Sequence, residues 1–119
     1  MEGELVERVA ASRSIFELRS LDLATLDDPD LQIDAIPADA TVIDLRSKAA
    51  YQQWHHPGAL FFEFAEAMAA YASFDRSLRY VLYCEFGLKS AHLAERMRSE
   101  GLDASSYRNG AATLRQAPR

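Results

Sequence analysis

The chain has 119 residues, of which 49% are hydrophobic and 26% are charged, and its formal net charge is −5. This length and hydrophobic content suit one compact domain, and the acidic balance argues against a protein that binds nucleic acid on its own. The only cysteine, Cys84, excludes an internal disulfide and a zinc site of several cysteines, and it suits a reducing, cytoplasmic setting.

The first part of the chain, residues 1–26, predicts a connecting segment ahead of the main domain, which we expect over residues 27–119. Three short elements are expected in this segment, a helix, a strand and a helical turn: Glu4–Ser12, Ser14–Leu18 and Leu21–Leu26. The following stretch, Asp27–Asp39, is acidic and contains two prolines. It therefore predicts a connecting loop at the start of the main domain.

The rest of the chain alternates short apolar runs, typical of buried strands, with helical patterns. The expected strands are Thr41–Leu45, Leu60–Phe64, Tyr80–Tyr83 and Ala104–Tyr107. The expected helices are Lys48–Trp54, Glu66–Ser73, the stretch from Ser90 to a stop at Gly101, and Ala111–Gln116. Turns are expected at His55–Ala59 and Asn109–Gly110. This alternation predicts an α/β fold with a central, mostly parallel sheet flanked by helices on both faces.

The most informative stretch is Tyr80–Gly101, in which the cysteine directly follows a predicted strand and a tight loop leads to a helix. Backbone N–H groups of such a loop can converge on an anion, and the helix N-terminus adds unsatisfied N–H groups. Both favour the thiolate form of Cys84, which is the nucleophilic form. Gly87 suits the tight loop, Ser90 is a candidate helix cap, and Lys89 adds a cation. Position alone leaves a buried structural cysteine as the alternative.

Several other polar residues are candidates for a chemical role. Asp44 and Arg46 lie at the carboxyl end of a predicted strand, where sites form in parallel sheets, and they also suit a structural ion pair. His55 and His56 are adjacent, so their side chains diverge, and without further ligands we expect no metal site. Glu85 beside the cysteine opposes ionisation of the thiol, so we expect its side chain to point to solvent.

Four segments resemble the rhodanese (sulfurtransferase) family, and they occur in the family's order: Val42–Arg46, Tyr51, His55–Ala59 and Cys84–Lys89. The sequence CEFGLKS, together with SIFELRSLDL and IDAIPADATVIDLRS upstream, is most similar to the C-terminal rhodanese domain of tRNA 4-thiouridine synthetases. Within these segments, His56 replaces an apolar residue of the family turn, and Lys89 stands where arginine is common. The family's late Gly-Gly pair matches Asn109–Gly110.

The resemblance implies a rhodanese-like three-layer domain that transfers sulfur, with Cys84 carrying sulfane sulfur as a persulfide. It implies supporting roles for Asp44 and Arg46, and no cofactor. It also implies that the loop after the cysteine binds the substrate, through Glu85, Phe86, Gly87, Leu88, Lys89 and Ser90. The implied sulfur donor is the persulfide of a cysteine desulfurase, or thiosulfate.

The sequence also bears on three other functions. A cysteine phosphatase carries an arginine after five further residues, to clamp phosphate, and that position is Ser90 here. A free-standing thiosulfate sulfurtransferase is an alternative. A rhodanese-like module used only for binding or regulation is another, although such modules usually lack the cysteine or have a broken loop.

The resemblance to synthetases extends to what the chain lacks. It has no Ser-Gly-Gly-x-Asp-Ser loop of the kind that binds ATP, and an acidic domain does not suit tRNA binding alone. We therefore expect a cytoplasmic domain that serves tRNA thiolation together with an upstream ATP-binding domain. No stretch of the sequence predicts a membrane partner.

Overall fold

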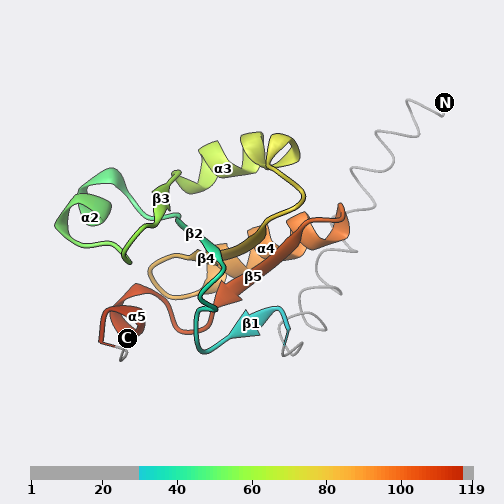
Figure 1. Ribbon diagram of the computed structural model, residues 1–119. Coiled ribbons are helices and arrows are strands. Elements are labelled where there is room, and N and C mark those ends of the chain that lie inside the picture. Colours follow the sequence, from blue (N-terminus) through green and yellow to red (C-terminus); the bar gives the residue numbers. More distant parts are fainter. Residues whose placement is uncertain (1–29, 117–119) are drawn as a thin grey trace, which may run out of the picture.

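The computed structural model describes residues 30–116, which form a five-stranded sheet with helices packed against it (Figure 1). The strands are β1 (Gln32–Ile33), β2 (Thr41–Asp44), β3 (Leu60–Phe61), β4 (Arg79–Tyr83) and β5 (Asp103–Tyr107). The helices are α2 (Lys48–Gln53), α3 (Phe64–Ala70), the 3₁₀ helix η1 (Tyr71–Ser73), α4 (Leu88–Ser99) and α5 (Ala111–Gln116). The strand order is β1-β5-β4-β2-β3 and every neighbouring pair is parallel, which confirms the predicted fold class.

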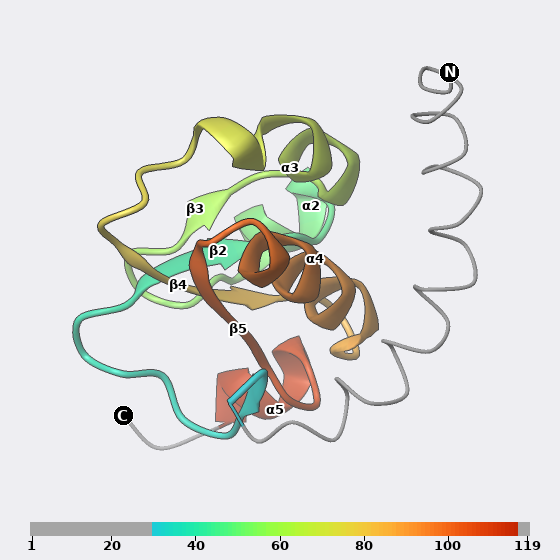
Figure 2. The ribbon, with the colours of Figure 1, turned by 90° about the vertical axis from the view of Figure 1, so that its right-hand side faces the viewer.

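Two hydrophobic clusters lie on opposite faces of the sheet, as the period of two in a strand requires. Ile43 and Leu82 point to one face, and their neighbours Val42 and Val81 point to the other. The first face is covered by α3, η1 and α4 through Ala67, Tyr71, Ala91, Leu93, Ala94 and Met97. The second face is covered by α5 and α2 through Ala111, Leu114 and Tyr51. Helices therefore flank the sheet on both sides, giving three layers (Figure 2).

The two central strands end at the same edge of the sheet. In the parallel register of β2 and β4, Asp44 lies opposite Tyr83, and the amide of Leu45 donates to the carbonyl oxygen of Tyr83 over 2.9 Å. The residues that follow these strands, Arg46 and Cys84, are therefore brought to one edge although they are far apart in the sequence. Carboxyl ends of parallel strands are where sites form in open α/β sheets.

Two predicted boundaries are wrong for a physical reason. The sequence predicts a loop over Asp27–Asp39, but this stretch contains β1, whose residue Gln32 pairs with Ser106 of β5. Two residues are too few to produce a periodic signal, so only pairing with β5 makes them a strand. The strand expected over Leu60–Phe64 is shorter, because Glu63 caps α3 in a reciprocal capping box with Glu66.

The three elements expected before residue 27 lie outside the described residues. Between residues 30 and 116, none of the helices has both the length and the apolar character that crossing a membrane requires.

Candidate functional site

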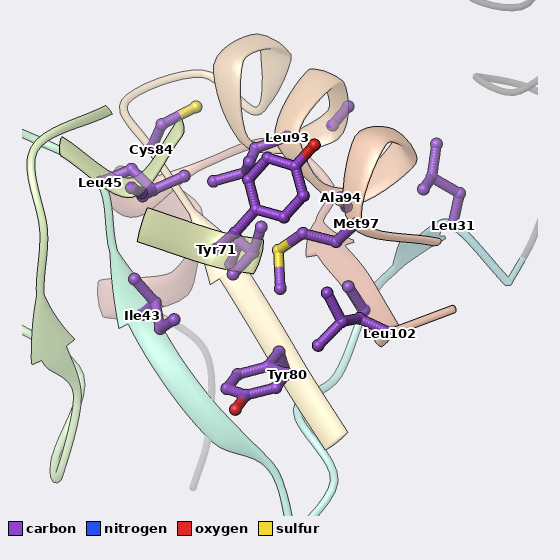
Figure 3. Close-up of a cluster of buried hydrophobic side chains, with 14 residues drawn as sticks. Leu31, Ile43, Leu45, Tyr71, Tyr80, Cys84, Leu93, Ala94, Met97 and Leu102 are labelled. Carbon is purple, nitrogen blue, oxygen red and sulfur yellow. The ribbon is translucent and has the colours of Figure 1, made fainter. Parts of the chain in front are cut away.

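Cys84 directly follows β4, and its side chain is only 5% exposed. Its sulfur accepts hydrogen bonds from the backbone amides of Gly87, at 3.2 Å, and Ser90, at 3.3 Å. Figure 3 shows the cysteine beside Leu45 at one end of the first hydrophobic cluster, with Tyr80 at the other end. Two N–H groups thus converge on one sulfur, an arrangement that stabilises negative charge on it.

The start of α4 explains this convergence. The helix begins at Leu88, and Gly87 is its N-cap with φ 93°, a conformation that glycine adopts without a steric penalty. Ser90 is then the third helical residue, so its amide belongs to the first turn, which has no carbonyl partner inside the helix. That amide is free to donate to Cys84. The prediction that Ser90 begins and caps the helix is wrong, because the helix starts two residues earlier.

The side chain of Ser90 has a different role from capping. It is fully buried, and its hydroxyl lies 3.3 Å from the sulfur of Cys84 and 2.7 Å from the hydroxyl of Ser106 on β5. Nothing in the sequence pattern distinguished Ser106 from its neighbour Ser105. The parallel pairing of β4 and β5, which sets Leu82 opposite Ser106, brings it to the site.

A pocket of about 660 Å³ opens in front of the cysteine. It is lined by Leu45, Arg46, Ser47, Glu63, Phe64, Ala65, Cys84, Glu85, Phe86, Leu88 and Lys89. Of the predicted loop residues, four therefore line the pocket, whereas Gly87 and Ser90 contact the sulfur itself. Phe86 and Leu88 are 79% and 70% exposed, so the rim of the pocket presents apolar side chains to solvent.

Charged side chains also border this pocket. Glu85 is exposed, as expected from the sequence, and its carboxylate is therefore solvated. The ammonium of Lys89 lies 5.7 Å from the ring centroid of Phe64, within the range of a cation–π contact. The cation that the sequence placed near the loop thus rests against α3 at the pocket wall.

Asp44 and Arg46 form a buried ion pair beside the pocket. The carboxylate of Asp44 is fully buried and accepts from Arg46 Nη2 at 2.8 Å and from the Tyr83 hydroxyl at 2.7 Å. Arg46 also donates to the carbonyl oxygen of Trp54, and its guanidinium lies within cation–π range of the Trp54 and Tyr83 rings, 5.7 and 5.5 Å from their centroids. The pair therefore ties the ends of β2 and β4 to the segment after α2.

This network perturbs the titration of two of its members. Burial raises the pKa of Tyr83, and its hydrogen bond to Asp44 raises it further. Burial lowers the pKa of Arg46, but the hydrogen bond and the charge of Asp44 outweigh that effect and raise it overall. The sequence did not indicate Tyr83 as part of this network, because it lies in an apolar run typical of a core strand.

The turn before α5 supports the cysteine loop from outside. The amide of Ala111 donates to the carbonyl oxygens of Cys84, at 2.9 Å, and Glu85, at 3.2 Å. Gly110 has φ 86°, and a Cβ atom there would lie 2.0 Å from the Glu85 carbonyl oxygen. The predicted turn at Asn109–Gly110 is present, but its packing against the loop is a tertiary contact that the Asn-Gly dipeptide does not reveal.

The histidine pair lies in the turn after α2. The His55 ring stacks on Tyr51 with centroids 3.8 Å apart, and its Nδ1 lies 2.9 Å from the Tyr51 carbonyl oxygen. The backbone amide of His56 donates to the Tyr83 hydroxyl at 3.0 Å. Over residues 30–116, no three His, Cys, Asp or Glu side chains gather in a way that could hold a metal ion.

Comparison with known proteins decides the family. A family model described as "Rhodanese-like domain" matches residues 25–116. The chain belongs to this family. Two curated relatives, both named tRNA sulfurtransferase, come from Pyrobaculum aerophilum, 33% identical over 108 residues, and Thermoplasma acidophilum, 34% identical over 101 residues. The alignments cover 88% and 85% of this chain but 22% and 19% of the relatives, so this rhodanese-like domain spans about a fifth of their length.

Solved structures share the fold. A rhodanese-related protein from Thermoplasma volcanium superposes with a TM-score of 0.61 at 18% identity, covering 68% of this chain and 82% of that chain. A NAD-dependent persulfide reductase from A. fulgidus also gives 0.61, at 16% identity, and covers 84% of this chain and 18% of that chain. These likenesses confirm the predicted three-layer, rhodanese-like fold.

Proposed function

We propose that this rhodanese-like domain is a sulfurtransferase domain that carries sulfane sulfur as a persulfide on Cys84. One observation carries the proposal: the sulfur of the only cysteine accepts two backbone hydrogen bonds and borders a pocket. A structural cysteine has no need of such donors, whereas a thiolate or a persulfide anion is stabilised by them. The names of the curated relatives support the same activity.

Loading begins with attack of the Cys84 thiolate on the outer sulfur of the donor. A new S–S bond forms to Cys84 while the donor's bond to that sulfur breaks, and the electron pair of the broken bond leaves with the donor. A cysteine desulfurase persulfide leaves as its cysteine thiolate, and thiosulfate leaves as sulfite. The transferred atom enters the pocket, which has room for it in front of the cysteine.

Delivery reverses this sequence. An acceptor nucleophile bonds to the terminal sulfur, the S–S bond to Cys84 breaks, and its electron pair restores the Cys84 thiolate. The amides of Gly87 and Ser90 stabilise the negative sulfur before and after each step. Glu85, Phe86, Leu88 and Lys89 line the path of the incoming group, and the Asp44–Arg46 pair supports the pocket wall.

The proposed use of the sulfur is tRNA thiolation to 4-thiouridine. This domain spans about a fifth of relatives named tRNA sulfurtransferase, so we assign binding and activation of tRNA to an upstream ATP-binding domain. Its charge of −5 is consistent with no direct tRNA binding. The main domain begins near residue 27 in this proposal, and its free thiol suits the cytoplasm. Release through a disulfide would require a thiol outside this chain, which has one cysteine.

The decisive measurement is the intact mass of the domain after incubation with a low-molecular-weight persulfide or with thiosulfate. We expect a gain of one sulfur atom that cyanide removes, and no gain in Cys84→Ser, which is nearly isosteric and keeps the fold. An unchanged mass in the wild-type domain, or equal loading of the variant, would contradict the assignment of Cys84 as the sulfur carrier.

A second experiment tests the use of the sulfur. The persulfide-loaded domain is supplied to a separately expressed ATP-binding domain of a tRNA sulfurtransferase, with ATP and tRNA. Appearance of 4-thiouridine supports the proposal. Efficient delivery to cyanide without 4-thiouridine favours a free-standing thiosulfate sulfurtransferase, and no loading at all favours a binding or regulatory module.

A further inference from the structure

Two buried serine hydroxyls continue the hydrogen-bonding chain behind the cysteine. Ser90 on α4 and Ser106 on β5 are both 0% exposed, and their Oγ atoms are 2.7 Å apart. Ser90 Oγ is also 3.3 Å from the sulfur of Cys84. Within the described part of the chain, Ser90 Oγ is the only hydrogen-bond partner found for Ser106 Oγ. The sulfur and two oxygens thus form a line of three atoms joined by two contacts.

The number of protons on this line depends on the ionisation of the cysteine. When Cys84 is a thiol, the three atoms carry three protons, but only two hydrogen bonds join the atoms and each uses one proton. If the thiol donates to Ser90 and Ser90 donates to Ser106, the buried Ser106 proton has no acceptor among the three groups, which is unfavourable. With a thiolate, the two hydroxyl protons serve two contacts: Ser106 donates to Ser90, and Ser90 donates to the sulfur. The arrangement therefore matches an anionic sulfur.

We propose that Ser106 is a positioning residue that favours the anionic sulfur of Cys84 by acting through Ser90. When Ser106 donates to the Ser90 oxygen, the Ser90 proton is left to point at the sulfur. The donated bond also polarises the Ser90 hydroxyl and strengthens its bond to the sulfur. This proposal rests on the proposed function, in which Cys84 carries negative charge first as a thiolate and then as a persulfide. The effect of Ser106 through Ser90 can nevertheless be tested on the thiolate alone.

Other groups that act on the sulfur are unaffected by a change at Ser106. The charged side chains that line the pocket come from four places: Arg46 follows β2, Glu63 precedes α3, Glu85 lies in the cysteine loop, and Lys89 lies in the first turn of α4. None of them bonds to Ser106 in the described residues. The two amide donors to the sulfur are backbone groups and are kept in any side-chain variant.

The test is the rate of Cys84 alkylation by iodoacetamide as a function of pH, measured on the full 119-residue chain. In Ser106→Ala we expect a rate about three- to tenfold lower on the acidic side of the profile, the effect of losing one modest hydrogen bond. The plateau rate at high pH should not fall, because every sulfur is then ionised and a thiolate of higher pKa is the better nucleophile. Ser105→Ala is the matched control, because its hydroxyl is on the same strand but donates to the Asp30 carbonyl oxygen.

A second pair of variants separates the hydroxyl from its packing. Ser106→Thr and Ser106→Val have side chains of nearly the same shape, and only threonine keeps the hydroxyl. We expect the threonine variant to follow the wild-type profile and the valine variant to follow Ser106→Ala. Equal profiles for threonine and valine, a wild-type profile for Ser106→Ala, or a loss of plateau rate without a shift would each overturn the proposal. Alkylation involves no sulfur donor, so this result is independent of whether the domain transfers sulfur.

Discussion

Replacement of Gly110 by alanine should detach the cysteine loop from the turn that supports it. The glycine has φ 86°, and its missing side chain leaves room for the loop carbonyl of Glu85. A Cβ atom at this position would lie 2.0 Å from that oxygen and 2.7 Å from the Cα of Phe86. Both neighbours are backbone atoms, so the overlap cannot be relieved by a change of side-chain rotamer.

The expected size follows from two separate costs. A non-glycine residue at positive φ costs about 1 to 2 kcal/mol. Opening the contact to an ordinary 3.4 Å requires the loop to move by about 1.4 Å, and overpacking of this kind costs about 1 to 3 kcal/mol. The same movement would lengthen the 3.2 and 3.3 Å bonds from the amides of Gly87 and Ser90 to the sulfur, so the proposed sulfur transfer should slow as well.

Gly58 offers a matched control for the first cost. Its φ is 81°, close to that of Gly110, but a Cβ there meets nothing within 4 Å. Urea unfolding of Gly110→Ala and Gly58→Ala, compared with the wild-type domain, isolates the steric cost. We expect Gly110→Ala to be less stable than Gly58→Ala by about 1 to 3 kcal/mol, and to transfer sulfur to cyanide more slowly. Equal stability and equal transfer rates in the two variants would refute the argument.

Two further predictions concern the buried network beside the pocket. Asp44→Asn leaves Arg46 without its counter-ion, so the free energy of unfolding measured in urea should fall by about 3 to 5 kcal/mol; a loss below about 1 kcal/mol would show that the pair is not required. The second prediction concerns Tyr83, whose pKa in the folded chain is raised by burial and by Asp44. As the pH rises, the unfolded chain therefore releases the phenol proton before the folded chain does. Its contribution to stability is therefore complete below about pH 10 and is lost as pH rises further, so stability should fall less steeply between about pH 10 and 12 in Tyr83→Phe than in the wild type. Parallel curves for the two proteins would contradict this.

The sequence was sufficient to predict the fold class and the place of the cysteine loop between a strand and a helix. Val42 and Ile43, like Val81 and Leu82, belong to short apolar runs of β-branched and aromatic residues that are typical of strands covered on both faces, so their alternation with helical patterns predicted the parallel sheet. The loop after Cys84 was recognisable because its glycine and the helix that follows are local features. Local features depend on neighbouring residues, and a sequence displays neighbours directly.

The tertiary structure alone decided which distant residues join this loop. Ser106 faces the site because β5 pairs with β4 in one register, and a shift of one residue would have turned its side chain to the other face. Tyr83 meets Asp44 by the parallel register of β2 and β4, and Gly110 meets Glu85 by the return of the chain beside the loop. Strand register and the path of the returning chain depend on the packing of the whole domain, so no local pattern in the sequence encodes these contacts.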